Sequence, residues 1–168
     1  MAKIELRPLS IQDGHLVYRM LQRIPAHENG FYNAANGLSY DQYKNWLKQR
    51  VEAEQGIGLE ENEVEESIYW LVLNDIPIGI GKLRHRLTPH LKMYGGSIAY
   101  CIMPKYRGYG YGTVLLAMLL QQARTLALPE VLLVIYNYNL ASERVIQKNG
   151  GVLYNKTELR SYYYFSPS

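Results

Sequence analysis

Apolar and polar residues follow a helical period in the first third of the chain and mainly a strand period afterwards. Apolar residues recur at helical spacing from Asp13 to Arg23, just before Pro25. Ser39 and Gln42 have the spacing of a capping box, which predicts that a second helix begins there. The apolar face of this helix would comprise Tyr43, Trp46, Leu47 and Val51.

Short β-type runs make up most of the remaining chain. They cover residues 4–7, 67–73, 78–87, 97–102, 131–136, 152–154 and 159–165. Helices are predicted at 113–126 and at 140–148, the second capped by Asn139 and followed by Gly150. We interpret residues 25–38, 55–66 and 88–95 as loops. The order of elements (strand, two helices, three strands, helix, strand, helix, two strands) predicts a mixed α/β fold with helices flanking one central sheet.

Length and composition restrict the class of protein. A chain of 168 residues suits one domain spanning 1–168, and no apolar stretch is long enough for a membrane helix. Glu5 lies where a signal peptide needs apolar residues, and the single Cys101 excludes an internal disulfide framework. We therefore expect a soluble cytoplasmic protein, a monomer or a homodimer, with no membrane partner.

Charge is distributed unevenly along the chain. Residues 1–80 hold 7 Lys and Arg against 12 Asp and Glu, whereas residues 81–168 hold 11 against 3. A basic half could bind a polyanion, either a nucleic acid or a phosphate-bearing cofactor, or it could simply be a solvated surface. Lys and Arg never stand next to each other, which argues against nucleic acid.

The most informative segment is the turn Arg107–Gly112, which joins the strand 97–102 to the helix 113–126. Gly108, Gly110 and Gly112 allow close approach of a ligand to the backbone, and the helix start attracts anions, so the turn could hold a pyrophosphate. A P-loop is excluded because no Lys precedes Thr113. A dinucleotide fingerprint is excluded by the glycine spacing and by the turn's late place in the chain.

Arg107-x-x-Gly110-x-Gly112 resembles the R-x-x-G-x-G/A signature of the GNAT superfamily of acyl-CoA-dependent N-acyltransferases. A second segment with Asn139, Ser142 and a helix that ends near Asn149-Gly150 resembles that superfamily's next element. Leu83–Leu87 and Asn149–Gly151 further resemble bacterial GNAT acetyltransferases. The resemblance implies a mostly antiparallel sheet that splays between its fourth and fifth strands, 97–102 and 131–136. It also implies acetyl-CoA as the co-substrate.

The resemblance assigns residues to the cofactor. It implies that Ile102 and Met103, at the strand end, contact pantetheine through their backbone groups. The pyrophosphate would lie in the glycine-rich turn, against Arg107, Gly108, Gly110, Gly112 and Thr113. The side chain of Asn139 would contact the cofactor arm, and Ser142 and Arg144 would lie near the adenosine phosphate. Ser142 and Arg144 could instead be ordinary surface residues of their helix.

The usual acid and base of the family are missing. The positions that often carry a Glu base and a Tyr acid hold Ser97 and Ile146. His85 is the first candidate base, because its strand should pair with 97–102, although it could be structural between Arg84 and Arg86. Glu28, in the loop expected to overhang the acceptor, is the second candidate, or else an exposed loop acid.

Several other residues with reactive side chains receive less specific interpretations. Tyr100 could orient the substrate or water, and Cys101 is expected to be a small apolar filler. His15, His27 and His90 lack a spacing that implies a metal.

The sequence thus predicts an N-acetyltransferase that moves an acetyl group from acetyl-CoA to a primary amine by direct attack in a ternary complex, without a metal. The acceptor, a small amine or a peptide amine, is not readable. The alternative is a degenerate GNAT protein that binds CoA as a sensor or interaction module, and nucleic-acid binding is a third reading.

Overall fold

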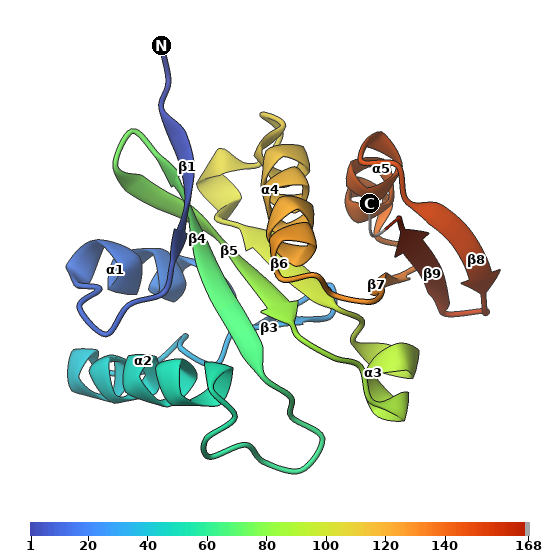
Figure 1. Cartoon of the computed structure of the whole chain (residues 1–168). Coiled ribbons are helices and arrows are strands. Elements are labelled where there is room, and N and C mark those ends of the chain that lie inside the picture. Colours follow the sequence, from blue (N-terminus) through green and yellow to red (C-terminus); the bar gives the residue numbers. More distant parts are fainter. Residues whose placement is uncertain (167–168) are drawn as a thin grey trace.

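An antiparallel sheet of four strands forms the first part of the structure (Figure 1). Its strands follow the order β1 (Ile4–Pro8), β4 (Glu66–Leu73), β5 (Ile76–Arg84) and β6 (Ile98–Ile102). The computed structural model describes residues 1–166. Asn74 and Asp75 both have positive φ in the predicted turn between β4 and β5, as a two-residue hairpin turn requires. The expected pairing of β5 with β6 is confirmed, although β5 ends at Arg84 rather than at residue 87.

A second antiparallel sheet holds the last three strands. Its order is β7 (Val131–Tyr136), β9 (Arg160–Phe165) and β8 (Val152–Lys156). The two sheets meet at Ser97 and Leu132. The N–H of Ser97 donates to the carbonyl of Leu132 (2.6 Å), and the N–H of Leu132 donates to Ser97 Oγ (3.0 Å). The expected central sheet is therefore divided between β6 and β7, which is the splay that the family resemblance implies.

Helices cover both faces of the sheets. They are α1 (His15–Arg23), α2 (Tyr40–Glu54), α3 (Pro89–Tyr94), α4 (Tyr111–Thr125) and α5 (Leu140–Lys148), with a 3-10 turn at Pro104–Tyr106. One core joins α1 and α2 to the first sheet around Trp70, and the other joins α4 and α5 to both sheets around Leu116. Among the described residues, no helix has the length and apolar character needed to cross a membrane.

Both predicted helix caps are confirmed. Ser39 Oγ accepts from the N–H of Gln42 and the Gln42 side chain accepts from the N–H of Ser39, while Asn139 Oδ1 accepts from the N–H of Ser142. The expectation that Val51 belongs to the apolar face of α2 is wrong, since Val51 is 37% exposed. Val51 lies near the end of α2, beyond Tyr43, Trp46 and Leu47, which form the contact of this helix with the sheet.

Two of the expected loops contain regular structure. Residues 88–95 hold α3, which Thr88 caps through its Oγ1 and which Pro89 begins. Residues 25–38 hold a small hairpin of β2 (His27–Glu28) and β3 (Phe31–Tyr32) around the turn Asn29-Gly30. Asn-Gly is a strong hairpin signal, because both residues tolerate positive φ, so this element was readable from the sequence.

Candidate active site

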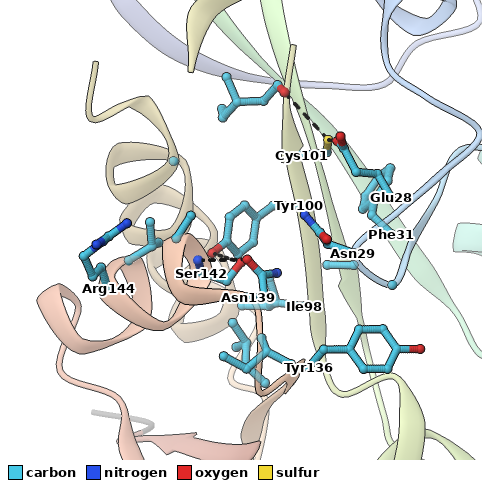
Figure 2. Close-up of a pocket in the computed structure, with 18 of the residues that line it drawn as sticks. Glu28, Asn29, Phe31, Ile98, Tyr100, Cys101, Tyr136, Asn139, Ser142 and Arg144 are labelled. Atoms are coloured by element: carbon cyan, nitrogen blue, oxygen red, sulfur yellow. Dashed lines mark hydrogen bonds between the residues drawn. The ribbon is translucent and has the colours of Figure 1, made fainter. Parts of the chain in front are cut away.

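The space between β6 and β7 widens into a cavity of about 560 Å³ (Figure 2). The β2–β3 hairpin, the end of α3, the glycine-rich turn and the start of α5 complete its walls. Of the residues that the resemblance assigns to the cofactor, all except Met103 line the cavity. Segments far apart in the sequence therefore meet around one space.

The edge of β6 that faces the cavity carries backbone groups turned away from β5. The N–H of Met103 donates to the carbonyl of Ile78 (2.8 Å), and Ile102 stands opposite Gly79. Residues of an antiparallel pair alternate between bonded and non-bonded positions, so the N–H and C=O groups of Tyr100 and Ile102 point toward the opening. The carbonyl of Ile102 already accepts from Arg107 Nε (2.9 Å). An extended ligand could bond to the other three groups as an added strand does. The predicted backbone contact at Met103 is already taken by Ile78.

The glycine-rich turn forms an anion site at the start of α4. Gly108 and Gly110 both have φ +85°, a conformation that residues with side chains rarely adopt. Gly110 is the N-cap of α4, and no side chain caps the helix among the described residues. The first N–H groups of α4 therefore lack intrahelical partners and, together with the helix dipole, favour a negative group in this part of the cavity.

The side chain of Arg107 lies away from the expected phosphate position. Its guanidinium donates to both carboxylate oxygens of Glu28 (3.1 Å from Nη1 to Oε2), and its Nε donates to the carbonyl of Ile102 (2.9 Å). The hydrogen bond to Glu28 raises the pKa of Arg107 further above its usual range. The positive character of the turn thus comes from its backbone, while Arg107 connects the β2–β3 hairpin to the end of β6.

The β2–β3 hairpin is held over one side of the cavity at two further points. The ammonium of Lys82 donates to the carbonyl of Tyr32 (2.7 Å) and lies 4.8 Å from the Phe31 ring centre. A Cβ on Gly30 would lie 3.0 Å from the ring of Tyr136, so glycine permits this close approach. Burial lowers the pKa of Lys82 to about 8, because desolvation disfavours its charged form.

Hydroxyl and amide groups gather on the other side of β6, as Figure 2 shows. The hydroxyl of Tyr100 donates to Ser142 Oγ (3.2 Å), and Ser142 also donates its N–H to Asn139. Burial raises the pKa of Tyr100 to about 12, so its hydroxyl keeps its proton at neutral pH. Arg144 and Lys148 line the cavity on α5.

The structure separates the two candidate bases. Glu28 lines the cavity, whereas His85 is absent from the lining residues. His85 follows the end of β5, where its Nε2 lies 2.7 Å from Ser67 Oγ and its N–H donates to Glu65. The usual acid and base positions are structural, since Ser97 joins the two sheets and Ile146, on the inner face of α5, is fully buried in the core.

The structure also shows the surroundings of Cys101 and of three histidines. Cys101 is buried, burial raises the pKa of its thiol, and Arg107 donates to its sulfur (3.5 Å). His15, His27 and His90 each lie against a tyrosine ring. Within residues 1–166, no group of three His, Cys, Asp or Glu side chains could hold a metal ion.

Several lining residues were not anticipated from the sequence. They include Asn29 and Phe31 of the hairpin, Tyr94 of α3, Tyr136 of β7 and Arg160 of β9. Their strands and loops were mostly placed, but nothing local to them indicates a shared cavity. Only the Asn29-Gly30 turn carried a signal, since it predicts a hairpin rather than a loop.

The model of the GNAT acetyltransferase domain matches residues 3–152 of the chain, which is nearly all of it. The chain belongs to the GNAT acetyltransferase family. As a member of this family it is an acyltransferase, and the glycine-rich turn, the splayed strands and the capped α5 are the parts of the GNAT fold that its sequence indicated. None of the curated proteins compared with the chain matches it.

Solved structures of other GNAT acetyltransferases share the fold over nearly the whole chain. RimL, a ribosomal L7/L12 alpha-N-protein acetyltransferase solved with coenzyme A, has a TM-score of 0.69 at 15% identity, covering 96% of this chain and 93% of its own. Campylobacter jejuni PseH, solved with acetyl coenzyme A, has a TM-score of 0.65 at 12% identity, covering 99% and 100%. A spermidine N-acetyltransferase SpeG chimera from Vibrio cholerae and hSSAT has a TM-score of 0.66 at 15% identity, covering 98% and 95%.

Proposed function

We propose that this GNAT protein transfers an acetyl group from acetyl-CoA to a primary amine, which attacks the thioester directly while both substrates are bound. The observation that carries the proposal is the cavity between β6 and β7, which has an uncapped helix start at Gly110 and an edge of β6 at Tyr100 that pairs with no strand among the described residues. These features suit the diphosphate and the extended amide arm of CoA. RimL and PseH, which share the fold, were solved with CoA and acetyl-CoA.

The residues of the cavity fit CoA along its length. The N–H groups at the start of α4 would hold the pyrophosphate, with Gly108 and Gly110 leaving open space beside it. The N–H and C=O of Tyr100 and the N–H of Ile102, on the free edge of β6, would bond to the pantetheine amides. Arg144 and Lys148 would meet the phosphate of the adenosine end. CoA supplies the activated acetyl thioester, so no metal is needed for the transfer.

The chain must also move protons, because only a neutral amine attacks and the leaving thiolate must be protonated. Glu28 is the carboxylate that lines the cavity, and Arg107 fixes its orientation, so Glu28 would accept the amine proton directly or through water. Tyr100 carries a protonated hydroxyl on the opposite side of β6 and meets the requirement for a proton donor. In this proposal, His85 has no part in the chemistry.

A second candidate function is CoA binding without catalysis. The burial of Ser97 and Ile146 at the usual base and acid positions favours it, since neither residue can exchange protons with a substrate. One experiment separates the two functions: release of free thiol from acetyl-CoA is measured over a panel of amines, beside the melting temperature with and without CoA. A ligand at 100 times its Kd stabilises the folded state by about 2.7 kcal/mol.

Amine-dependent thiol release is the expected result. Stabilisation by CoA without turnover of any amine would support the non-catalytic function. No change in melting temperature at millimolar CoA would contradict both functions. A single domain over residues 1–168, a cytoplasmic location and a monomeric or homodimeric state stay predictions of the sequence.

A further inference from the structure

Arg160 lies between two tyrosine rings in the wall of the cavity. Its guanidinium carbon is 4.9 Å from the ring centre of Tyr94 in α3 and 5.2 Å from that of Tyr136 in β7. Arg160 begins β9 and stands opposite Tyr136 in the strand register. Stacking against aromatic faces fixes the plane of a guanidinium but leaves its N–H groups, which lie in that plane, available to a ligand.

The charge of Arg160 is not balanced within residues 1–166. Its guanidinium makes no ion pair or hydrogen bond with any of them, although the side chain is only partly exposed. Two other arginines of the lining pair with carboxylates. Arg84 pairs with Glu66 (3.2 Å) and donates to the carbonyls of Gly95 and Gly96, and Arg107 pairs with Glu28. Arg160 differs from these two in having no partner for its charge among the described residues.

Arg160 lies on the side of the sheets opposite the proposed CoA phosphate site. Leu133 and Ile135 of β7 pack into the core beneath α4, so Tyr136 points to the other face, because side chains alternate along a strand. Arg160 shares that face as the register partner of Tyr136. Tyr136 in turn lies against Gly30 of the hairpin that carries Glu28. Arg160 thus belongs with the proposed base rather than with Arg144 and Lys148.

The charges of the lining fit an anion better than a polycation. Among the described lining residues, Glu28 is the only carboxylate, and Arg107 already engages both of its oxygens. A polyamine would bring several positive charges to a wall that holds Arg84, Arg107 and Arg160. An acceptor with one negative group would neutralise Arg160 in a two-bonded, charge-assisted contact.

We propose that the acceptor is a primary amine that also carries an anionic group, carboxylate or phosphate, and that Arg160 binds this group and so determines substrate choice. The proposal rests on the proposed acetyl transfer and extends it to the class of acceptor. Arg160 is here a specificity residue that contacts the substrate away from the reacting amine.

Matched pairs of amines test the proposal. Glycine, β-alanine, 4-aminobutanoate and 5-aminopentanoate are each compared with their carboxamides, and phosphoethanolamine is compared with ethanolamine. The carboxylate series varies the distance between amine and anion, and the phosphate pair distinguishes the two kinds of anion. Putrescine and spermidine represent polycations. We expect the anionic member of at least one pair to have the higher kcat/KM and the polyamines to be the poorest acceptors.

Variants of Arg160 show whether this side chain is responsible. Since hydrogen bonds to charged groups contribute about 1.5–3 kcal/mol, Arg160→Gln should reduce the preference for the anionic member by about 10- to 100-fold. Arg160→Lys should recover part of the preference, because a lysine keeps the charge but cannot donate two parallel hydrogen bonds to the anion. Arg160→Glu should reverse the preference toward the diamine. Arg124→Gln, which removes an exposed arginine of α4 outside the lining, is the matched control and should change nothing.

The melting temperature of each variant with and without CoA shows whether the fold and the CoA site are intact. The role of Arg160 would be overturned if amines are acetylated without preference within the pairs, or if Arg160→Gln leaves the preference unchanged. Either result would still support acetyl transfer. If no amine is acetylated, titration calorimetry of the same pairs into the CoA complex decides. Tighter binding of the anionic member that is lost in Arg160→Gln would support the anion site alone, and equal binding would overturn it.

Discussion

Ser97 Oγ accepts the backbone N–H of Leu132 at 3.0 Å, and this bond fastens the two sheets at the closed end of the cavity. Ser97 is 1% exposed, so water cannot replace the bond. Leu132 lies in the buried part of β7, and its N–H would otherwise lack a partner on the side of β6. The residue at the position where many GNAT enzymes carry a base is thus a structural connection.

Replacing Ser97 by alanine should destabilise the fold without removing a catalytic group. A buried N–H without a partner costs about 1–3 kcal/mol, so we expect the free energy of unfolding of Ser97→Ala to fall by that amount. Urea denaturation measures it. Ser67→Ala is the matched control, because Ser67 is also buried but bonds the partly exposed His85, which water can satisfy. Equal losses in the two variants would contradict a special role for the Ser97 bond.

Gly110→Val should abolish CoA binding while the chain stays folded. Gly110 has φ +85° at the start of α4, and a branched side chain there would strain the turn and project toward the proposed pyrophosphate. Titration calorimetry with CoA measures the affinity. Gly150→Val provides the comparison, since Gly150 has φ +83° with open space around it but lies outside the cavity lining. If both variants fold and bind CoA like the parent, the phosphate site is elsewhere.

The rate of acetyl transfer should depend on Glu28 and not on His85. A positioned general base contributes roughly 10²–10⁴-fold, so we expect kcat of Glu28→Gln to fall by about 10²-fold or more. His85→Gln should keep the parent's kcat, because His85 faces Ser67 and not the cavity. Measured CoA affinity should be the same in all three proteins. A fall in kcat of folded His85→Gln as large as that of Glu28→Gln would restore His85 as the base.

Lys82 should make the fold more stable as pH rises through the range above about 8. Burial lowers its pKa to about 8 in the folded chain, whereas an unfolded lysine titrates near 10.4, so the unfolded state binds more protons between these values. The free energy of unfolding of the parent should therefore rise with pH in this window, relative to Lys82→Met. Lys92→Met is the control, because Lys92 has a side chain 51% exposed. Parallel pH curves for the parent and Lys82→Met would show that the buried charge costs nothing.

Local sequence signals predicted helices and turns correctly where the residues that determine the structure lie within the same short segment. The capping box at Ser39, the cap at Asn139 and the glycine-rich turn before α4 all proved correct, because each depends on bonds within a few residues. The Thr88-Pro89 start of α3 and the Asn29-Gly30 hairpin are equally local, but both segments contain the Gly and Pro that are typical of loops, so the loops expected there are wrong.

The contacts that define the site could not be read in this way. Glu28 and Arg107 are 79 positions apart, and the sequence gives no reason for the guanidinium to leave the glycine-rich turn for a hairpin carboxylate. The stacking of Arg160 between Tyr94 and Tyr136 likewise joins α3, β7 and β9. The resemblance assigned the segments that we propose to bind CoA, and these segments line one cavity, because a family motif records contacts between distant residues. It could not place the acceptor side, where this chain departs from the family's usual base.

The corner where the two sheets meet also limits how the protein could be adapted to other acyl donors. Gly96 has φ +71°, and a Cβ there would lie 2.6 Å from the carbonyl of Leu132. Because the close contact is with backbone atoms, a side chain at position 96 would push the two sheets apart instead of reshaping the cavity between them. Ile98 and Leu133, in contrast, line the cavity with side chains that can be shortened. Shortening such side chains would enlarge the cavity and leave the corner intact.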